Sequence, residues 1–165
     1  MRIILASTMA LALAACGSEK SGTIETEDGE TAEYTIDDSS GGVTASIETE
    51  DGTATMQTGE NVKADLPNGF SVYPGATIQS VTNVAQDGDK GSLVMLESTD
   101  SPQKIADHYR KEAEAAGISI EMDLTVNDGK MIGGTGENGM SFSLNATPSE
   151  GTTQAQLMVS EGLGN

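Results

Sequence analysis

Tryptophan is absent from this chain, and cysteine and histidine occur once each, as Cys16 and His108. A single cysteine cannot build a disulfide framework or a thiolate zinc site, and a single histidine excludes a metal site that needs two. Basic residues are also scarce, because 8 Lys and Arg stand against 26 Asp and Glu, which gives a formal net charge of −18. Phosphate binding requires clustered Lys and Arg, so this balance argues against a nucleic-acid partner.

The chain also has no apolar run of the roughly 20 residues that are needed to span a bilayer. Its N-terminus instead carries one charge, Arg2, followed by a shorter apolar stretch over residues 3–15 that is interrupted by Ser7 and Thr8. A charged start, a short apolar core and small residues at its end are typical of a secretory signal peptide. The stretch ends in Leu-Ala-Ala-Cys at residues 13–16, and Gly17-Ser18 follows.

This Leu-Ala-Ala-Cys run resembles the lipobox of bacterial lipoprotein precursors. The resemblance covers residues 1–17 and implies that residues 1–15 are a signal peptide, cleaved between Ala15 and Cys16. It further implies that Cys16 becomes the first residue of the mature protein, with acyl chains on its thiol and its amino group. The protein would then be anchored in the bacterial cell envelope. In this family, Gly17-Ser18 after the cysteine favours the outer membrane over the inner one.

Residues 16–64 form an acidic segment rich in Thr and Gly, with 12 acidic and 2 basic residues after Cys16. Low hydrophobicity combined with high net charge predicts a solvated, largely disordered tether. The alternative is a pair of short β-hairpins, because Ile-Glu-Thr-Glu-Asp-Gly occurs at residues 24–29 and again at 47–52. Alternation that ends in Asp-Gly is a hairpin signal.

The acids of the two repeats are hard oxygen ligands of the kind that Ca²⁺ prefers. They lack the spacing of an EF-hand loop, and runs of acids are usually solvated. The acidic Asp87-Gly88-Asp89 segment also lacks the later ligands of a calcium loop, so we interpret it as a hairpin turn. We therefore expect no metal site and no cofactor.

Residues 65–165 hold enough apolar residues for one modest core and are predicted to form the folded domain. Asp100-Ser101-Pro102 combines a capping side chain with Pro in the first turn, and Gly117 supplies the stop, so a helix is expected between them. Apolar residues alternate with polar ones over residues 118–126, which predicts a half-buried strand. Further strands are expected at residues 77–84, 93–96, 130–134, 140–146 and 155–159.

These elements predict an α+β fold of order ββαββββ. We expect an antiparallel sheet of five to six strands, with one helix covering its apolar face and a polar outward face of Ser, Thr, Asn, Gln and acids. The block resembles small envelope proteins of unknown function in which a Tyr-Pro-Gly turn precedes two strands and an Asp-Ser-Pro helix start. The matching residues are Tyr73-Pro74-Gly75-Ala76, Asp100-Ser101-Pro102 and Tyr109.

No catalytic residue is predicted. His108 is the only imidazole, and the sequence contains no nucleophile elbow to pair with it. The leading hypothesis is a lipid-anchored envelope protein with a non-catalytic binding or interaction domain. It would contact the membrane through its lipid anchor and bind an envelope protein as its partner. One alternative is an envelope-maintenance lipoprotein without a specific ligand. The other is a hydrolase acting at His108, which requires a cleft lined by Ser or acid.

Overall fold

The computed structural model describes residues 19–25, 31–38, 42–59 and 62–162. These ranges contain ten strands and one α-helix, α1 (Pro102–Ala115), together with two short 3-10 helices at Pro67–Gly69 and Glu137–Gly139. The strands are β1 (Glu19–Glu25), β2 (Thr31–Asp37), β3 (Gly42–Glu48), β4 (Gly52–Gly59), β5 (Thr77–Gln86), β6 (Asp89–Ser98), β7 (Ser119–Val126), β8 (Gly129–Thr135), β9 (Ser141–Ser149) and β10 (Thr152–Glu161).

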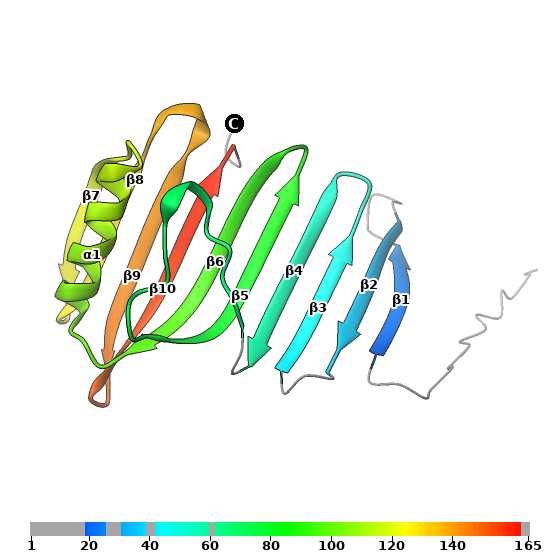
Figure 1. Ribbon diagram of the computed structural model, residues 1–165, viewed down its shortest axis with the longest axis horizontal. Coiled ribbons are helices and arrows are strands. Elements are labelled where there is room, and N and C mark those ends of the chain that lie inside the picture. The colour runs from blue at the N-terminus through cyan, green and yellow to red at the C-terminus, as the bar shows by residue number, and fades with distance from the viewer. Residues whose placement is uncertain (1–18, 26–30, 39–41, 60–61, 163–165) are drawn as a thin grey trace, which may run out of the picture.

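All ten strands form one sheet in the order β1-β2-β3-β4-β5-β6-β10-β9-β8-β7, and every neighbouring pair is antiparallel (Figure 1). The expected sheet of five to six strands with a covering helix is therefore wrong. The sheet is larger because residues 19–59 contribute four strands to it. The single helix packs on β7, β8 and β9 and leaves the β1–β4 end of the sheet without a helix.

The sheet is extended through the pairing of β4 with β5. Seven residue pairs join these strands, from Gly52 opposite Gln86 to Thr58 opposite Ser80. The second sequence repeat supplies the β3–β4 turn, which Thr49 and Gly52 close with backbone hydrogen bonds to each other. The turn of the first repeat lies outside the described residues, although β1 and β2 on either side of it are paired. Residues 19–59 therefore adopt the hairpin alternative, because each hairpin gains a neighbouring strand that an isolated hairpin lacks.

The residues that flank helix α1 set where it begins and where it ends. The Ser101 side chain caps the first turn by accepting a hydrogen bond from the Lys104 backbone N–H. Gly117, with φ +80°, ends the helix in a conformation that other residues rarely adopt. Between them, Ile105, Tyr109 and Ala113 are fully buried against the sheet. They pack on the inward side chains of β8 and β9, which include Ile132, Leu144 and Phe142.

A strap, here defined as residues 62–76, covers the same face of the sheet beside α1 and crosses in front of β10, β6 and β5 (Figure 1). Its Phe70 ring stacks on the Phe142 ring of β9, with centroids 5.4 Å apart. The Ser92 hydroxyl of β6 donates a hydrogen bond of 3.0 Å to the Asp65 carbonyl oxygen. Aromatic pairs of this kind contribute about 0.5–1.5 kcal/mol beyond the area they bury. The strap therefore closes the core beside the helix.

The strand that follows the helix lies at the far edge of the sheet. β7 runs in the same direction as β6 but is separated from it by β10, β9 and β8. None of the helices in the described part of the chain has the length and hydropathy needed to cross a membrane.

Candidate functional site

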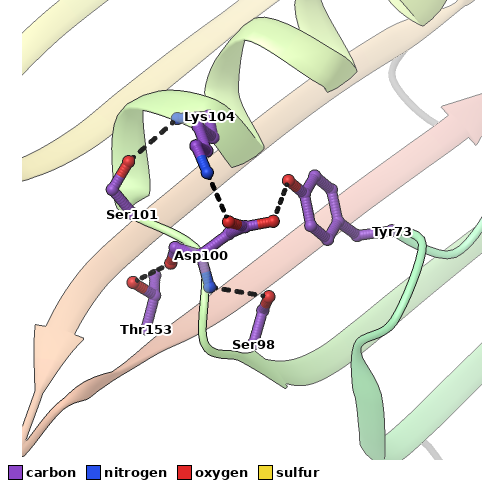
Figure 2. A network of polar contacts seen from close by, with 6 residues as sticks. All are labelled: Tyr73, Ser98, Asp100, Ser101, Lys104 and Thr153. Carbon is purple, nitrogen blue, oxygen red and sulfur yellow. Dashed lines mark hydrogen bonds and ion pairs between the residues drawn. The ribbon is translucent and has the colours of Figure 1, made fainter.

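Tyr73 links the strap to the start of α1. Its hydroxyl donates a hydrogen bond of 2.9 Å to Asp100 Oδ2, and the Lys104 ammonium reaches the other oxygen of the same carboxylate at 2.8 Å (Figure 2). The backbone of Asp100 is held as well, because its N–H donates to Ser98 Oγ and its carbonyl oxygen accepts from Thr153. The sequence-based resemblance included Tyr73 and Asp100, and the structure joins them directly.

These contacts shift the proton affinities of both side chains. The pKa of Asp100 lies below its usual value, chiefly because Lys104 donates a hydrogen bond to the carboxylate and Tyr73 donates another. The pKa of Tyr73 is raised, first by burial and then by its hydrogen bond to Asp100. Both groups therefore keep their usual charge at neutral pH, and the cluster fastens the strap and the helix end together.

His108, the residue of the hydrolase alternative, lies between two aromatic rings. The Tyr73 and Tyr109 rings each approach the imidazole edge-on, with centroids 5.1 Å away. His108 Nε2 lies 3.3 Å from Glu112 Oε1 but makes no hydrogen bond within the described residues.

A serine and a glutamate do lie near His108, but their order is not that of a nucleophilic triad. The Ser71 hydroxyl donates to Glu112 Oε1 at 2.5 Å, and the Ser71 backbone N–H donates to Glu112 Oε2 at 3.2 Å. A triad places the histidine between the nucleophile and the acid, so that it accepts the hydroxyl proton. In this protein the Glu112 carboxylate, and not His108, accepts the hydrogen bond from the Ser71 hydroxyl. Ser71 and Glu112 fasten the strap to the helix, and the arrangement does not activate a nucleophile.

A second polar cluster lies at the other end of α1. Asp123 of β7 receives the Lys130 ammonium at 2.7 Å and the Arg110 guanidinium at 2.6 Å. Lys130 also donates to the Thr125 hydroxyl at 3.1 Å. The pKa of Asp123 is lowered, first by the hydrogen bond from Lys130 and then by that from Arg110. The cluster ties the helix to the edge strand β7.

Neither α1 nor the strap covers the opposite side of the sheet, and the exposed apolar side chains gather there. Residues directly opposite each other in neighbouring strands share one face, so the strand register assigns every sheet residue to a side. We call the side that carries α1 the helix face and the other side the open face. All eight large hydrophobic side chains that are exposed in the described residues lie on the open face: Ile24, Ile36, Val43, Ile47, Met56, Leu124, Val126 and Met158.

The two sides of β1–β4 differ sharply in charge. The helix face of these strands carries four acids and no base among the described side chains, namely Glu25, Glu33, Asp37 and Glu48. The open face of the same strands has Lys20 as its only charged residue. The polar outward face expected for residues 65–165 is present on β5, with Ser80, Thr82 and Gln86, and on β9 and β10, where Asn145 and Gln156 lie opposite each other. Leu93 and Met95 of β6 and the exposed Leu124 and Val126 of β7 depart from it.

A shallow hollow of about 210 Å³ lies at the end of β3, β4 and β5. Ile47, Ala54 and Val84 of the open face line it, together with Asp51 of the β3–β4 turn. Alternation of apolar and small polar residues in Val43–Ile47 and Ala54–Met56 was the sequence signal for this face. This alternation does not by itself assign the residues to a face, because an isolated hairpin has no stable inner or outer side.

Cys16, the residue expected to carry the lipid, and the expected cleavage site between Ala15 and Cys16 lie outside the described residues. So do Glu27, Asp28 and Glu30 of the first repeat. Within the described ranges, no group of three or more His, Cys, Asp or Glu side chains is close enough to hold a metal ion.

A protein-family model described as START domain-like matches residues 78–156, which run from β5 through α1 into β10. No curated protein and no solved structure matches the chain. Domains of the matched kind are generally ligand-binding rather than catalytic, so the match favours a non-catalytic binding domain in this chain. The matched region covers the part of the sheet that α1 and the strap enclose, while β1–β4 precede it.

Proposed function

We propose that this protein is a lipid-anchored protein of the bacterial cell envelope whose sheet is a non-catalytic binding module. The observation that carries the binding role is the open face, which gathers every large exposed hydrophobic side chain of the described residues on one side of the sheet. Large exposed apolar patches on soluble domains mark interaction sites. The START domain-like match over residues 78–156 supports binding rather than catalysis.

The anchor is proposed from the Leu-Ala-Ala-Cys motif at residues 13–16. Acyl chains on Cys16 would hold the protein to the membrane at about 0.8 kcal/mol per buried CH₂ group, and more than one chain is needed for stable anchoring. Gly17-Ser18 after the cysteine supports the outer membrane as the location. Because β1 begins at Glu19, only two residues separate the anchor from the sheet. They span at most about 10 Å, so the sheet would lie close to the membrane surface.

Mass spectrometry of the mature N-terminus tests the anchor. We expect an acylated cysteine as residue 16, and we expect Cys16→Ser to release the protein from the membrane fraction or to leave it unprocessed. An unmodified mature N-terminus at another residue would rule the anchor out.

Thiol labelling tests the binding face. Ile47 and Glu48 are adjacent in β3, both are exposed, and they lie on the open and helix faces respectively. In cells, acylation of Cys16 leaves an introduced cysteine as the only free thiol. If the open face is mostly occupied in the envelope, Ile47→Cys should react with a small maleimide about tenfold more slowly there than after purification and dilution.

The matched variant Glu48→Cys should react at the same rate in both settings. Equal rates for Ile47→Cys in the envelope and in dilute solution would show that the open face is unoccupied. The binding role assigned to that face would then be wrong, whatever the outcome for the anchor.

A further inference from the structure

We propose that the open face of β1–β6 docks against the same face of a second copy of this chain. This inference rests on the proposed function, because it names the partner of the binding face. The strand register places six side chains of β2, β3, β4 and β6 on one side of the sheet, and the contact surface centres on them: Tyr34, Ile36, Val43, Ile47, Met56 and Leu93.

The area of this face fits a stable dimer. β1–β6 contain 7 to 10 residues each. With about 4.8 Å between strands and about 3.3 Å per residue, six such strands present a flat area of roughly 700–950 Å². A typical stable protein interface buries about 800 Å² on each partner. The face is therefore large enough without help from β7–β10.

The distribution of charge permits a contact between two open faces and opposes a contact between two helix faces. Strands β2–β5 place no charged residue on the open face, so two copies can approach there despite a net charge of −18 each. The helix face of β1–β4 is acidic, and two acidic faces would repel. Packing the open faces together buries the neutral sides of β2–β5 and leaves Glu33 and Glu48 on the outer face. The two acids on the open face of β6, Asp89 and Glu97, lie at the two ends of that strand.

The composition of the face also favours a protein surface over a lipid surface. Proteins that lie on membranes place Lys and Arg around their apolar contact and insert Trp or Phe. The open face of β1–β6 carries Lys20 as its only base and Tyr34 as its only aromatic residue. Its Ile, Val, Met and Ala side chains resemble instead the inner face of a β-sandwich, in which two sheets pack about 10 Å apart.

A two-fold axis completes the arrangement. In a symmetric dimer the same patch serves both partners, so one self-complementary face is sufficient. The proposed lipid anchors would hold both copies at one membrane surface and raise their effective concentration there.

Sedimentation of the unlipidated Cys16→Ser chain tests the dimer. Its mass in native buffer is compared with the mass of the same sample in denaturant, so that the state of the signal peptide does not affect the ratio. We expect a ratio of two. Met56 and Gln57 are adjacent in β4 and lie on the open and helix faces, so they provide a matched pair.

Met56→Glu should weaken the dimer by about tenfold or more, because it places an unpaired charge in an apolar contact. Gln57→Glu adds the same charge on the helix face and should leave the dimer intact. Thermal unfolding of both variants checks that each is folded. A chain that stays monomeric up to about 100 µM, or a dimer that Met56→Glu leaves unchanged, would overturn the proposal.

Flotation with phosphatidylcholine vesicles separates the lipid alternative. Binding of the Cys16→Ser chain to vesicles that Met56→Glu abolishes would assign the face to the bilayer instead of a second copy. Slow labelling of Ile47→Cys in the envelope together with a monomeric purified chain would retain the binding role and reject self-association. Fast labelling would reject both.

Discussion

The Tyr109 hydroxyl oxygen accepts a hydrogen bond of 3.0 Å from the backbone N–H of Tyr73, and so joins the buried face of α1 to the strap. Tyr109 is fully buried, and burial raises the pKa of its phenol above the usual value. The contact spans 36 residues of sequence. The Tyr109 hydroxyl thus connects the helix, the strap and the core.

Replacing Tyr109 with Phe should lower the free energy of unfolding by about 0.5–1.5 kcal/mol, because the N–H of Tyr73 then loses its acceptor. Chemical denaturation at neutral pH measures this loss. Tyr34→Phe, at a half-buried position in β2, serves as the control and should change stability little. A Tyr109→Phe protein as stable as the wild type would show that water replaces the hydroxyl without cost.

Alkaline pH should destabilise the protein through the same side chain. Because the folded pKa of Tyr109 is raised above the usual value of 10.0, its contribution to stability is complete below about pH 10. It is lost as the pH rises through the folded value, since the unfolded chain gives up the proton first. Thermal unfolding between pH 8 and pH 11 should show a smaller loss for Tyr109→Phe than for the wild type.

Acidic pH should weaken the Asp123 cluster. The pKa of Asp123 is lowered in the folded protein, so its contribution is present above the usual carboxyl value of 3.8 and is lost as the pH falls through the lowered one. The difference in stability between wild type and Asp123→Asn should therefore shrink between about pH 6 and pH 3. Glu114→Gln, at an exposed helix position, is the control for the change in net charge. A difference that stays constant over this range would contradict the assignment.

Truncation of a leucine on the helix face should reduce stability more than truncation of a leucine on the open face. Leu144 of β9 is 1 % exposed and Leu124 of β7 is 49 % exposed. Leu144→Ala should cost about 2–5 kcal/mol, because it removes buried contacts and leaves a cavity. Leu124→Ala should cost much less in the same denaturation experiment. Similar losses for both variants would mean that the β7 end of the open face is covered.

A fragment of residues 62–165 should fold without β1–β4. Every residue of the main core cluster lies in this part of the chain. Its circular dichroism should retain the signal of α1, but β5 becomes an unpaired edge strand and should drive association. Placing a Lys at Thr82 of the fragment should suppress that association. A fragment that fails to fold would show that residues 19–59 are needed for the fold and that the expected domain boundary near residue 65 is wrong.

Local chemistry in the sequence was sufficient to locate the elements that enclose the core. Ser101, Pro102 and Gly117 predicted the helix because each acts within one turn of a helix end. Ser101 caps the first turn, Pro102 has a fixed φ that suits it, and Gly117 adopts the positive φ that ends the helix. Alternation over residues 118–126 predicted the strand β7 for the same reason, but the expected buried face is wrong. The register shifts between Ile120 and Met122, so Leu124 and Val126 lie exposed on the open face. The Asp87-Gly88 turn between β5 and β6 also follows from these two residues alone, which both adopt positive φ.

The candidate site was not predictable in this way. Tyr73 and Asp100 were noted in separate motifs, but the bond between their side chains depends on a strap that folds back over the sheet. His108 was correctly located on the helix, whereas its neighbours Ser71 and Glu112 come together only because the strap ends beside it.

The sequence by itself determined the net charge, the helix and the alternation within each strand, because composition fixes the charge and the other two depend on residues that are close along the chain. Only the tertiary structure decided that β4 pairs with β5 and that the repeats extend the sheet. A hairpin with Ile47 on one side and Glu48 on the other has the same pattern whether it is free in solvent or joined to a domain. The pairing partner, and therefore the open face, is set by strand pairing between residues such as Ala54 and Val84, 30 positions apart, which no local pattern specifies.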